Sequence, residues 1–211
     1  MKYAFRIAFC LFALLNPINA QDDNVETLFG NEMDKTGTYG GPILKFSQVD
    51  KNWELFFGGK GATVVNKTFG IGGAGYLMLT SRDILDYHPD DDPFYSKTVY
   101  LRDLYGGLLF EYINSYDKVI HFTVDLLLGA GLAAYTGPIS SNSYNDRWFY
   151  EGSAYFVAEP GVNIEVNIID NIRFNIGLSY RYVQGTSLQN TTDEDLRNVS
   201  ITIGFKFYDY Y

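Results

Sequence analysis

The sequence is poor in cysteine, in basic residues and in long apolar runs. It has 1 Cys, 6 Pro and 2 Trp in 211 residues, and 16 Lys and Arg face 25 Asp and Glu, for a net charge of −9. A single cysteine excludes a disulfide framework. The acidic balance argues against a nucleic-acid partner, because phosphate binding needs a basic surface. Outside the N-terminus no apolar run reaches the roughly 18–20 residues that a membrane helix needs. A membrane protein made of strands is not excluded.

The abundant residues favour β structure. The chain has 21 Gly, 18 Tyr and 16 Phe, and 46% of its residues are hydrophobic. Aromatic residues suit strands, whereas glycine weakens helices. This composition allows one domain with a sizeable core or wall.

Residues 1–20 have the features of a secretory signal peptide. Lys2 and Arg6 supply a positive start, a short apolar stretch follows, and Ala20 offers a small residue for cleavage. Asn16-Pro17 interrupts the stretch, which argues against a membrane anchor. Cleavage after Ala20 would leave a chain without cysteine and with a net charge of −11, because the first twenty residues carry two cations and no anion. An exported chain without cysteine indicates a bacterial envelope protein.

From Thr38 onward, apolar and polar residues alternate. In the last segment Val199, Ile201 and Ile203 are separated by small or polar residues. Strict alternation predicts a strand with one apolar and one polar face. We predict eight strands, at 38–48, 53–65, 68–79, 104–113, 120–132, 156–168, 172–182 and 199–207.

The connections between these strands alternate in length. Tight turns are expected at 66–67, 115–118 and 169–171, with a short link at 49–51, and long polar loops at 81–97, 138–148 and 186–197. Bacterial outer-membrane barrels have short periplasmic turns and longer external loops. The chain also ends on an aromatic stretch, Phe207 to Tyr211.

Signal peptide, alternation, loop asymmetry and aromatic end together resemble the small outer-membrane β-barrels of the OmpA transmembrane-domain and OmpX kind. The resemblance covers residues 37–211. It implies an all-β fold, an eight-stranded antiparallel up-and-down transmembrane β-barrel, in the outer membrane of a Gram-negative bacterium. Residues 21–36 are polar and are expected to be a periplasmic lead-in.

Periodicity alone also fits a soluble lipocalin-like barrel with its apolar face inward. The charges on the polar face favour the membrane version because they balance, as a sealed lumen requires. We therefore predict a lumen ion-pair network that plugs the barrel. Its five cations are Lys45, Lys60, Arg173, Arg181 and Lys206, and its five anions are Glu54, Glu111, Asp125, Glu159 and Glu165.

Three motifs suggest chemistry, and for each a structural interpretation is favoured. Gly70 to Gly75 matches G-x-G-x-x-G but falls within a predicted strand, not before a helix. His88 beside Asp86 and Asp90 to Asp92 could bind a divalent cation, yet charge runs usually mark a solvated loop. No metal or cofactor is therefore expected.

His121 shares a strand face with Thr123 and Asp125, an acid–base grouping. It follows a tight turn, however, so it is placed at the periplasmic end, away from the external lipid. A hydrogen-bonded lumen histidine is the favoured interpretation.

The long loops carry the functional prediction. Exposed aromatic and acidic side chains suit contact with a partner protein or glycan. The candidates are Asp90, Asp91, Asp92, Phe94, Tyr95, Tyr144 and Trp148. We expect a non-enzymatic, monomeric outer-membrane barrel with a structural or surface-interaction role, surrounded by lipid and lipopolysaccharide. The alternatives are a lipid-modifying barrel enzyme and the soluble ligand-binding barrel.

Overall fold

The computed structural model describes residues 37–88, 97–137 and 148–210. The expected signal peptide (1–20) and lead-in (21–36) lie outside these residues. Within them the chain forms nine strands and one short helix: β1 (Gly37–Val49), β2 (Asn52–Val65), β3 (Phe69–Met78), β4 (Arg82–Tyr87), β5 (Lys97–Asn114), β6 (Ile120–Thr136), β7 (Phe149–Ile169), β8 (Ile172–Gln184), α2 (Asp193–Leu196) and β9 (Asn198–Tyr210). In these ranges no helix is long and apolar enough to span a membrane.

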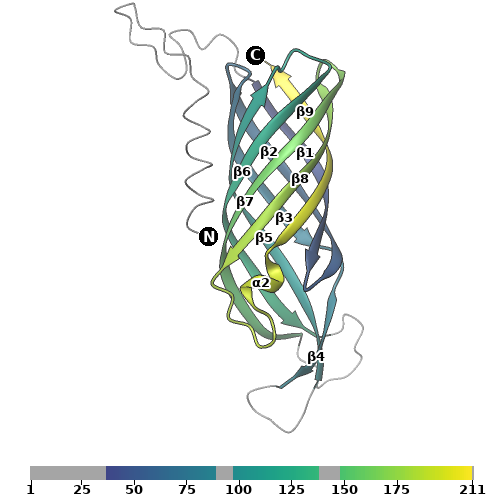
Figure 1. Ribbon diagram of the computed structural model, residues 1–211, viewed down its shortest axis with the longest axis vertical. Helices are drawn as coiled ribbons and strands as arrows, with labels where there is room; N and C mark the ends of the chain where they lie inside the picture. The colour runs from purple at the N-terminus through teal and green to yellow at the C-terminus, as the bar shows by residue number, and fades with distance from the viewer. Residues whose placement is uncertain (1–36, 89–96, 138–147, 211) are drawn as a thin grey trace, which may run out of the picture. The chain divides into compact units, whose positions relative to one another are not determined.

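Eight of the strands close into a barrel. The order is β3-β2-β1-β9-β8-β7-β6-β5, and pairing of β3 with β5 completes the ring (Figure 1). All of these pairs are antiparallel. A closed ring leaves no barrel strand with a free edge, so its backbone groups are satisfied internally. The predicted fold, an eight-stranded antiparallel up-and-down barrel, is confirmed.

The two ends of the barrel differ, as the loop lengths indicated. Residues Gly37 and Tyr210 and the turns at 66–68, 115–119 and 170–171 lie at one end, which we call the turn end. The other end, the loop end, carries the 50–51 turn and the longer connections at 79–96, 137–148 and 185–197. In Figure 1 the C-terminus marks the turn end, and α2 and β4 mark the loop end.

Two tight turns use left-handed backbone conformations. Asp50 and Lys51 have φ angles of 45° and 66°, and Asn66 and Lys67 have φ angles of 52° and 55°. Two consecutive residues with positive φ give a turn whose twist matches that of the flanking strands. These turns fix which face of β1 to β3 points inward, because a slip of one residue would reverse it.

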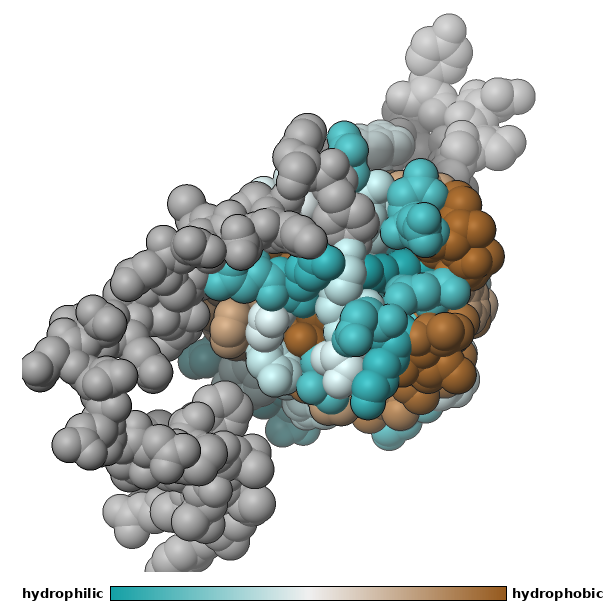
Figure 2. Space-filling model, turned by 90° about the horizontal axis from the view of Figure 1, so that it is seen from above, coloured by the Kyte–Doolittle hydropathy of each residue, from teal (hydrophilic) through white to brown (hydrophobic). Residues whose placement is uncertain are grey.

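The barrel is apolar outside and charged inside. Leu108 is 61% exposed and Val162 is 54% exposed, both on the outer face, whereas Lys45, Glu165 and Lys206 are fully buried. Figure 2 is viewed with the turn end facing the reader. Hydrophilic residues gather on this end face, and hydrophobic residues lie on the flank. This arrangement is the reverse of what the soluble lipocalin-like alternative requires.

The strand boundaries at the loop end differ from the prediction. β4 lies inside the predicted 81–97 loop, α2 lies inside the 186–197 loop, β5 begins at Lys97 and β7 begins at Phe149. We call β4 together with residues 97–103 of β5, 133–136 of β6 and 149–155 of β7 the loop-end extension. There the alternation is inverted, since Val99 and Leu101 are buried while Thr98 is exposed. A search for apolar outer faces therefore missed these residues.

Candidate functional site: the charged lumen

The eight barrel strands bring the predicted lumen residues together on one inner surface. Side chains on a strand point alternately to opposite faces, so one apolar outward set fixes one inward set. Nine of the ten predicted residues are buried, and the tenth, Asp125, has 15% of its side chain exposed. Asp103, which the prediction omitted, joins them in an ion pair.

Six charged residues form a cluster toward the turn end. They are Lys60, Glu111, Asp125, Glu165, Arg173 and Lys206. The Lys60 Nζ lies 3.2 Å from Glu111 and 3.3 Å from Asp125. The Lys206 Nζ bridges Glu111 at 3.0 Å and Glu165 at 2.5 Å, and Arg173 lies 3.8 Å from Glu165. Three cations face three anions, so the turn-end charge cluster is neutral. Neutrality matters because an uncompensated buried charge is strongly destabilising.

Four more charged residues form two ion pairs nearer the loop end. The Lys45 ammonium binds Glu159, and the Arg181 guanidinium binds Asp103 at 2.7 Å. We call these four residues the loop-end charge cluster, which is also neutral. Glu54, predicted as the fifth anion, forms no ion pair with another described residue. Asp103 takes its place in the balance of five cations and five anions.

The prediction omitted Asp103 because this residue belongs to the loop-end extension, where no apolar outer face indicates a strand. The available signal was its spacing. Asp103, Tyr105 and Glu111 lie an even number of residues apart, so they share one face of β5. Extending the strand backward from Glu111 would have found it.

Tyrosines complete the coordination of the buried carboxylates. Tyr39 donates a hydrogen bond to Glu111, and Tyr155 donates one to Asp103. Tyr105 donates to Glu159 at 2.8 Å and accepts from Lys45 at 2.9 Å. The predicted lumen residues include no tyrosine, so sequence reasoning missed these contacts. Hydrogen bonds to charged groups are among the stronger ones, so the tyrosines help to offset the desolvation of the carboxylates.

Aromatic rings also hold Arg173 in place. Its guanidinium carbon lies 3.8 Å from the centroid of the Tyr116 ring and 4.1 Å from that of Tyr208. Both rings lie toward the turn end, where Tyr208 packs in a small apolar cluster with Tyr39, Ala62, Val64 and Ile113. A cation between two rings in a buried place gains more than one at an exposed site. Arg173 is thus held between two aromatic rings toward the turn end of the lumen.

His121 is a buried lumen histidine, as the favoured interpretation predicted. The His121 Nε2 lies 3.4 Å from Glu165, and Thr123 donates to Glu165 at 3.1 Å. Asp125 instead accepts hydrogen bonds from Lys60 and Asn163. His121 and Thr123 therefore contact Glu165, whereas Asp125 has other partners.

His88 lies at the loop end, and its backbone N–H donates to the Gln189 side chain at 3.0 Å. It is far along the barrel from His121, which follows a turn at the opposite end. Among the described residues no group of three or more His, Cys, Asp or Glu is arranged to hold a metal ion. The glycines from Gly70 to Gly75 lie within β3, as the strand interpretation predicted.

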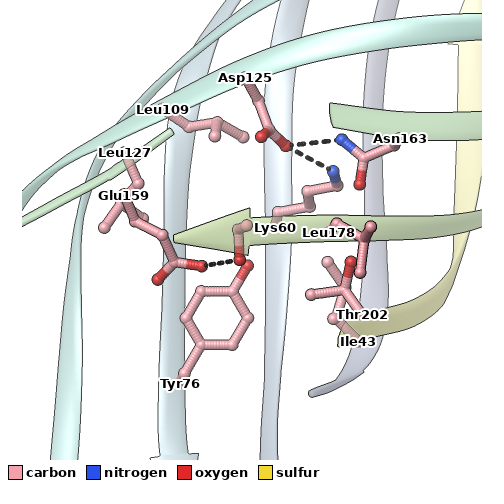
Figure 3. A pocket seen from close by; sticks show the side chains of 11 residues that line it. Ile43, Lys60, Tyr76, Leu109, Asp125, Leu127, Glu159, Asn163, Leu178 and Thr202 are labelled. Carbon is pink, nitrogen blue, oxygen red and sulfur yellow. Dashed lines mark hydrogen bonds and ion pairs between the residues drawn. The ribbon is translucent and has the colours of Figure 1, made fainter. Parts of the chain in front are cut away.

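A small cavity separates the two charge clusters (Figure 3). Its volume is about 20 Å³, and its lining includes Lys60, Asp125, Glu159 and Asn163. Lys60 and Asn163 both point toward Asp125, and Ser179 donates to Glu159 at 2.5 Å. A space of this size holds about one water molecule. At this level the lumen is packed with side chains.

The connection from β8 to β9 covers the mouth at the loop end. Leu188 and Leu196 are buried against a large apolar cluster that also includes Val99, Leu101, Tyr135, Tyr155 and Val183. Arg181 Nε donates to the Leu196 carbonyl at 2.9 Å, and the Asp50 N–H donates to the Asp195 carbonyl at 2.8 Å. The 185–197 segment is therefore fixed to both the lumen and the rim.

Asp193 organises the start of this segment. Its carboxylate accepts hydrogen bonds from the backbone N–H of Thr186 at 2.7 Å and of Gly185 at 3.2 Å. Partial desolvation acts to raise the pKa of Asp193, but these two hydrogen bonds outweigh it and hold the pKa below its usual value. Arg197, 3.4 Å away, adds to the lowering. The ionised Asp193 carboxylate thus holds the start of the 185–197 segment in place.

Most of the predicted external contact residues fall outside the described ranges. These are Asp90, Asp91, Asp92, Phe94, Tyr95 and Tyr144. Trp148 is described and is 72% exposed beside the start of β7.

Comparison with known proteins identifies the fold. No protein-family model matches the sequence, and no curated protein matches it. Among solved structures, Neisserial surface protein A is 10% identical with a TM-score of 0.53, over 82% of this chain and 96% of that one. Ail of Yersinia pestis, solved with the heparin analogue sucrose octasulfate, is 13% identical with a TM-score of 0.44, over 83% and 98%. OprG of Pseudomonas aeruginosa is 10% identical with a TM-score of 0.43, over 83% and 95%.

The likeness to Neisserial surface protein A extends over nearly the whole of that barrel. Together with the closed ring of eight strands and the apolar exterior, it shows that this chain has the fold of the small eight-stranded outer-membrane β-barrels.

Proposed function

We propose that the protein is a non-enzymatic barrel of the Gram-negative outer membrane, with a plugged lumen and a structural or surface-interaction role carried by its loop end. One observation supports this most strongly: ten ion-paired residues fill a barrel whose outer face is apolar. Outer-membrane barrels have a lipid-facing apolar band and a polar interior.

The turn end faces the periplasm in this proposal, and the loop end faces outward. The short turns and both barrel termini share one end, as in bacterial outer-membrane barrels. The loop-end extension then stands above the bilayer in water. Its exposed Thr98, and Trp148 just before β7, are available to a partner protein or glycan.

Membrane insertion is tested by fractionation combined with heat-modifiable gel mobility. A folded barrel resists detergent at room temperature, so it should migrate differently before and after boiling, and it should sediment with outer membranes. Release into the soluble fraction without detergent would contradict the proposal.

The plugged lumen is tested by conductance. Both charge clusters are buried and neutral, and the cavity between them holds about one water. The purified protein in planar bilayers should therefore show no discrete channel openings. Reproducible single-channel steps would contradict a plug.

The absence of enzymatic activity is proposed on the placement of the histidines. His121 is buried in the lumen toward the turn end, away from external lipid, and His88 lies at the opposite end. Cells carrying His88→Ala and His121→Ala should have unchanged lipid A by mass spectrometry. A lipid A modification that depends on the wild-type protein and is lost in either variant would contradict this assignment.

A further inference from the structure

The 185–197 connection, which we call the cap, lies over a buried cation. Arg181 is fully buried beneath it. The Arg181 Nη1 donates to Asp103 in the lumen at 2.7 Å, and its Nε donates to the Leu196 carbonyl of the cap at 2.9 Å. We propose that Arg181 couples the cap to the lumen, so that the free energy of closing the cap depends on the charge of Asp103. The proposal rests on the plugged lumen proposed above, because the cap is the outer part of that plug.

Closing the cap removes Arg181 from water. Leu196 of the cap is itself fully buried, in an apolar cluster with Val183 and Tyr155. A guanidinium in such surroundings is strongly destabilising unless an anion compensates it. Within the described ranges, Asp103 is the only carboxylate that forms an ion pair with Arg181. When Asp103 is uncharged, the state in which the cap is open and Arg181 meets water therefore becomes more populated.

Two further contacts of the cap lie along the rim and involve no lumen charge. The Asp50 N–H donates to the Asp195 carbonyl at 2.8 Å, and the Ser187 N–H donates to the Ser153 hydroxyl at 2.8 Å. Each is a hydrogen bond between neutral groups, which water can replace at a small net cost in free energy. Arg181, in contrast, contacts the cap and a lumen anion at once, so it transmits a change in lumen charge to the cap.

The two rim hydrogen bonds also report whether the cap is closed. The Asp50 amide belongs to the turn between β1 and β2, and the Ser187 amide belongs to the cap. Both amides are held by partners across the boundary between the cap and the rest of the barrel, so opening the cap exposes both to water. Their hydrogen exchange, measured by NMR on the full chain in phospholipid nanodiscs, therefore follows the population of the open state.

The test removes the charge of Asp103 and keeps its shape. In Asp103→Asn the side-chain oxygen can still accept the hydrogen bond from Tyr155. We expect exchange at both reporter amides to accelerate by about tenfold, as the loss of one hydrogen bond between charged groups implies. The matched control is Glu159→Gln, which neutralises the other anion of the loop-end charge cluster, paired with Lys45 and not with Arg181. In this control we expect exchange at both amides to stay as in wild type.

Unchanged exchange in Asp103→Asn, or equal acceleration in both variants, would overturn the coupling. If Asp103→Asn lacks heat-modifiable mobility, Arg181→Lys replaces it, and the same acceleration is expected. A lysine keeps the charge but lacks the planar fork that reaches Asp103 and the Leu196 carbonyl together. The conductance of the wild-type protein is measured separately. Channel openings there would contradict the plug, whereas a silent wild type with unchanged exchange in the variant would contradict the coupling alone.

Discussion

Two parts of the same strands follow opposite rules. In the membrane-spanning part of β5, Leu108 points outward and Glu111 is buried. In the loop-end extension of the same strand, Leu101 is buried and Thr98 is exposed. The strand keeps one register with β6 through both parts. In the proposed orientation, the medium outside it changes from hydrocarbon to water. The extension therefore has the pattern of a soluble sheet, continuous with a membrane barrel.

The two parts also differ in what holds them together. The turn-end charge cluster lies in the spanning part, whereas the large apolar cluster lies toward the loop end and includes Val99 and Leu101 of the extension. In a bilayer, an apolar lumen would gain little free energy, because the lipid outside the barrel is equally apolar. Paired charges can therefore fill the lumen, provided that each has a partner.

The largest expected effect comes from breaking the lumen network. Lys206→Ala leaves Glu111 and Glu165 without their shared cation and should lower the free energy of unfolding by about 3–5 kcal/mol. The matched variant is Arg82→Ala, which breaks a partly exposed ion pair to Asp50 of 2.8 Å at the loop end. It should cost about 1 kcal/mol or less.

Urea unfolding of both proteins in the same lipid, followed by gel mobility, compares the two costs. If the two variants lost equal free energies of unfolding, the buried ion pairs of Lys206 would stabilise the protein no more than the partly exposed pair of Arg82 at the loop end.

Reversing polarity on the outer face should affect only the spanning part. Leu108→Arg exposes a charge to hydrocarbon and should cost about 2–4 kcal/mol if the site lies near the bilayer midplane. Thr98→Arg, on the outer face of the extension, should change stability by about 0.5 kcal/mol or less. Folding yield into lipid vesicles at increasing urea measures both. If Leu108→Arg lowered stability no more than Thr98→Arg, the distinction between the two parts would be contradicted.

Acid should loosen the cap of the extension before the barrel. The pKa of Asp193 is depressed in the folded protein, so its stabilisation is fully present above the ordinary aspartate pKa. It is lost as the pH falls through the folded value, below about 4. The contribution is about 1 kcal/mol, because the carboxylate is partly exposed and water screens its interactions.

The amide NMR shifts of Gly185 and Thr186 should move in this acidic range, and Asp193→Asn should abolish that titration. Titration of these amides near neutral pH instead would contradict the assignment to Asp193.

The smallest effect concerns the hairpins. Lys51 has a φ of 66°, which costs a residue with a Cβ more than it costs glycine. Lys51→Gly should raise the free energy of unfolding by about 0.5–1 kcal/mol. Lys67→Gly, at φ 55°, should gain less because the Lys67 ammonium lies 5.1 Å from the Tyr116 ring centroid and that contact is lost. The same urea assay ranks them, and a destabilised Lys51→Gly would contradict the strain argument.

Sequence alone could predict the parts whose outer face is apolar. Alternation from Val199 to Phe207 and its counterparts placed all eight barrel strands, and charge balance selected buried residues such as Lys45 and Arg181. Sequence alone could not predict β4 or Asp103, because the outer face of the extension is not apolar and so lacks the pattern that indicated the other strands. Sequence alone also could not identify Glu165 as the residue that faces His121, since facing residues on β6 and β7 depend on register and not on spacing along β6.

The proposed function requires Leu108 to face lipid and Thr98, ten residues earlier on the same strand, to face water. Spin labels at single cysteines replacing each residue, in barrels reconstituted into phospholipid bilayers, test it directly. We expect oxygen to relax the label at Leu108 and a water-soluble nickel complex not to reach it. At Thr98 we expect the nickel complex to relax the label more than oxygen does. A label at Leu108 that the nickel complex reaches as readily as the label at Thr98 would contradict it.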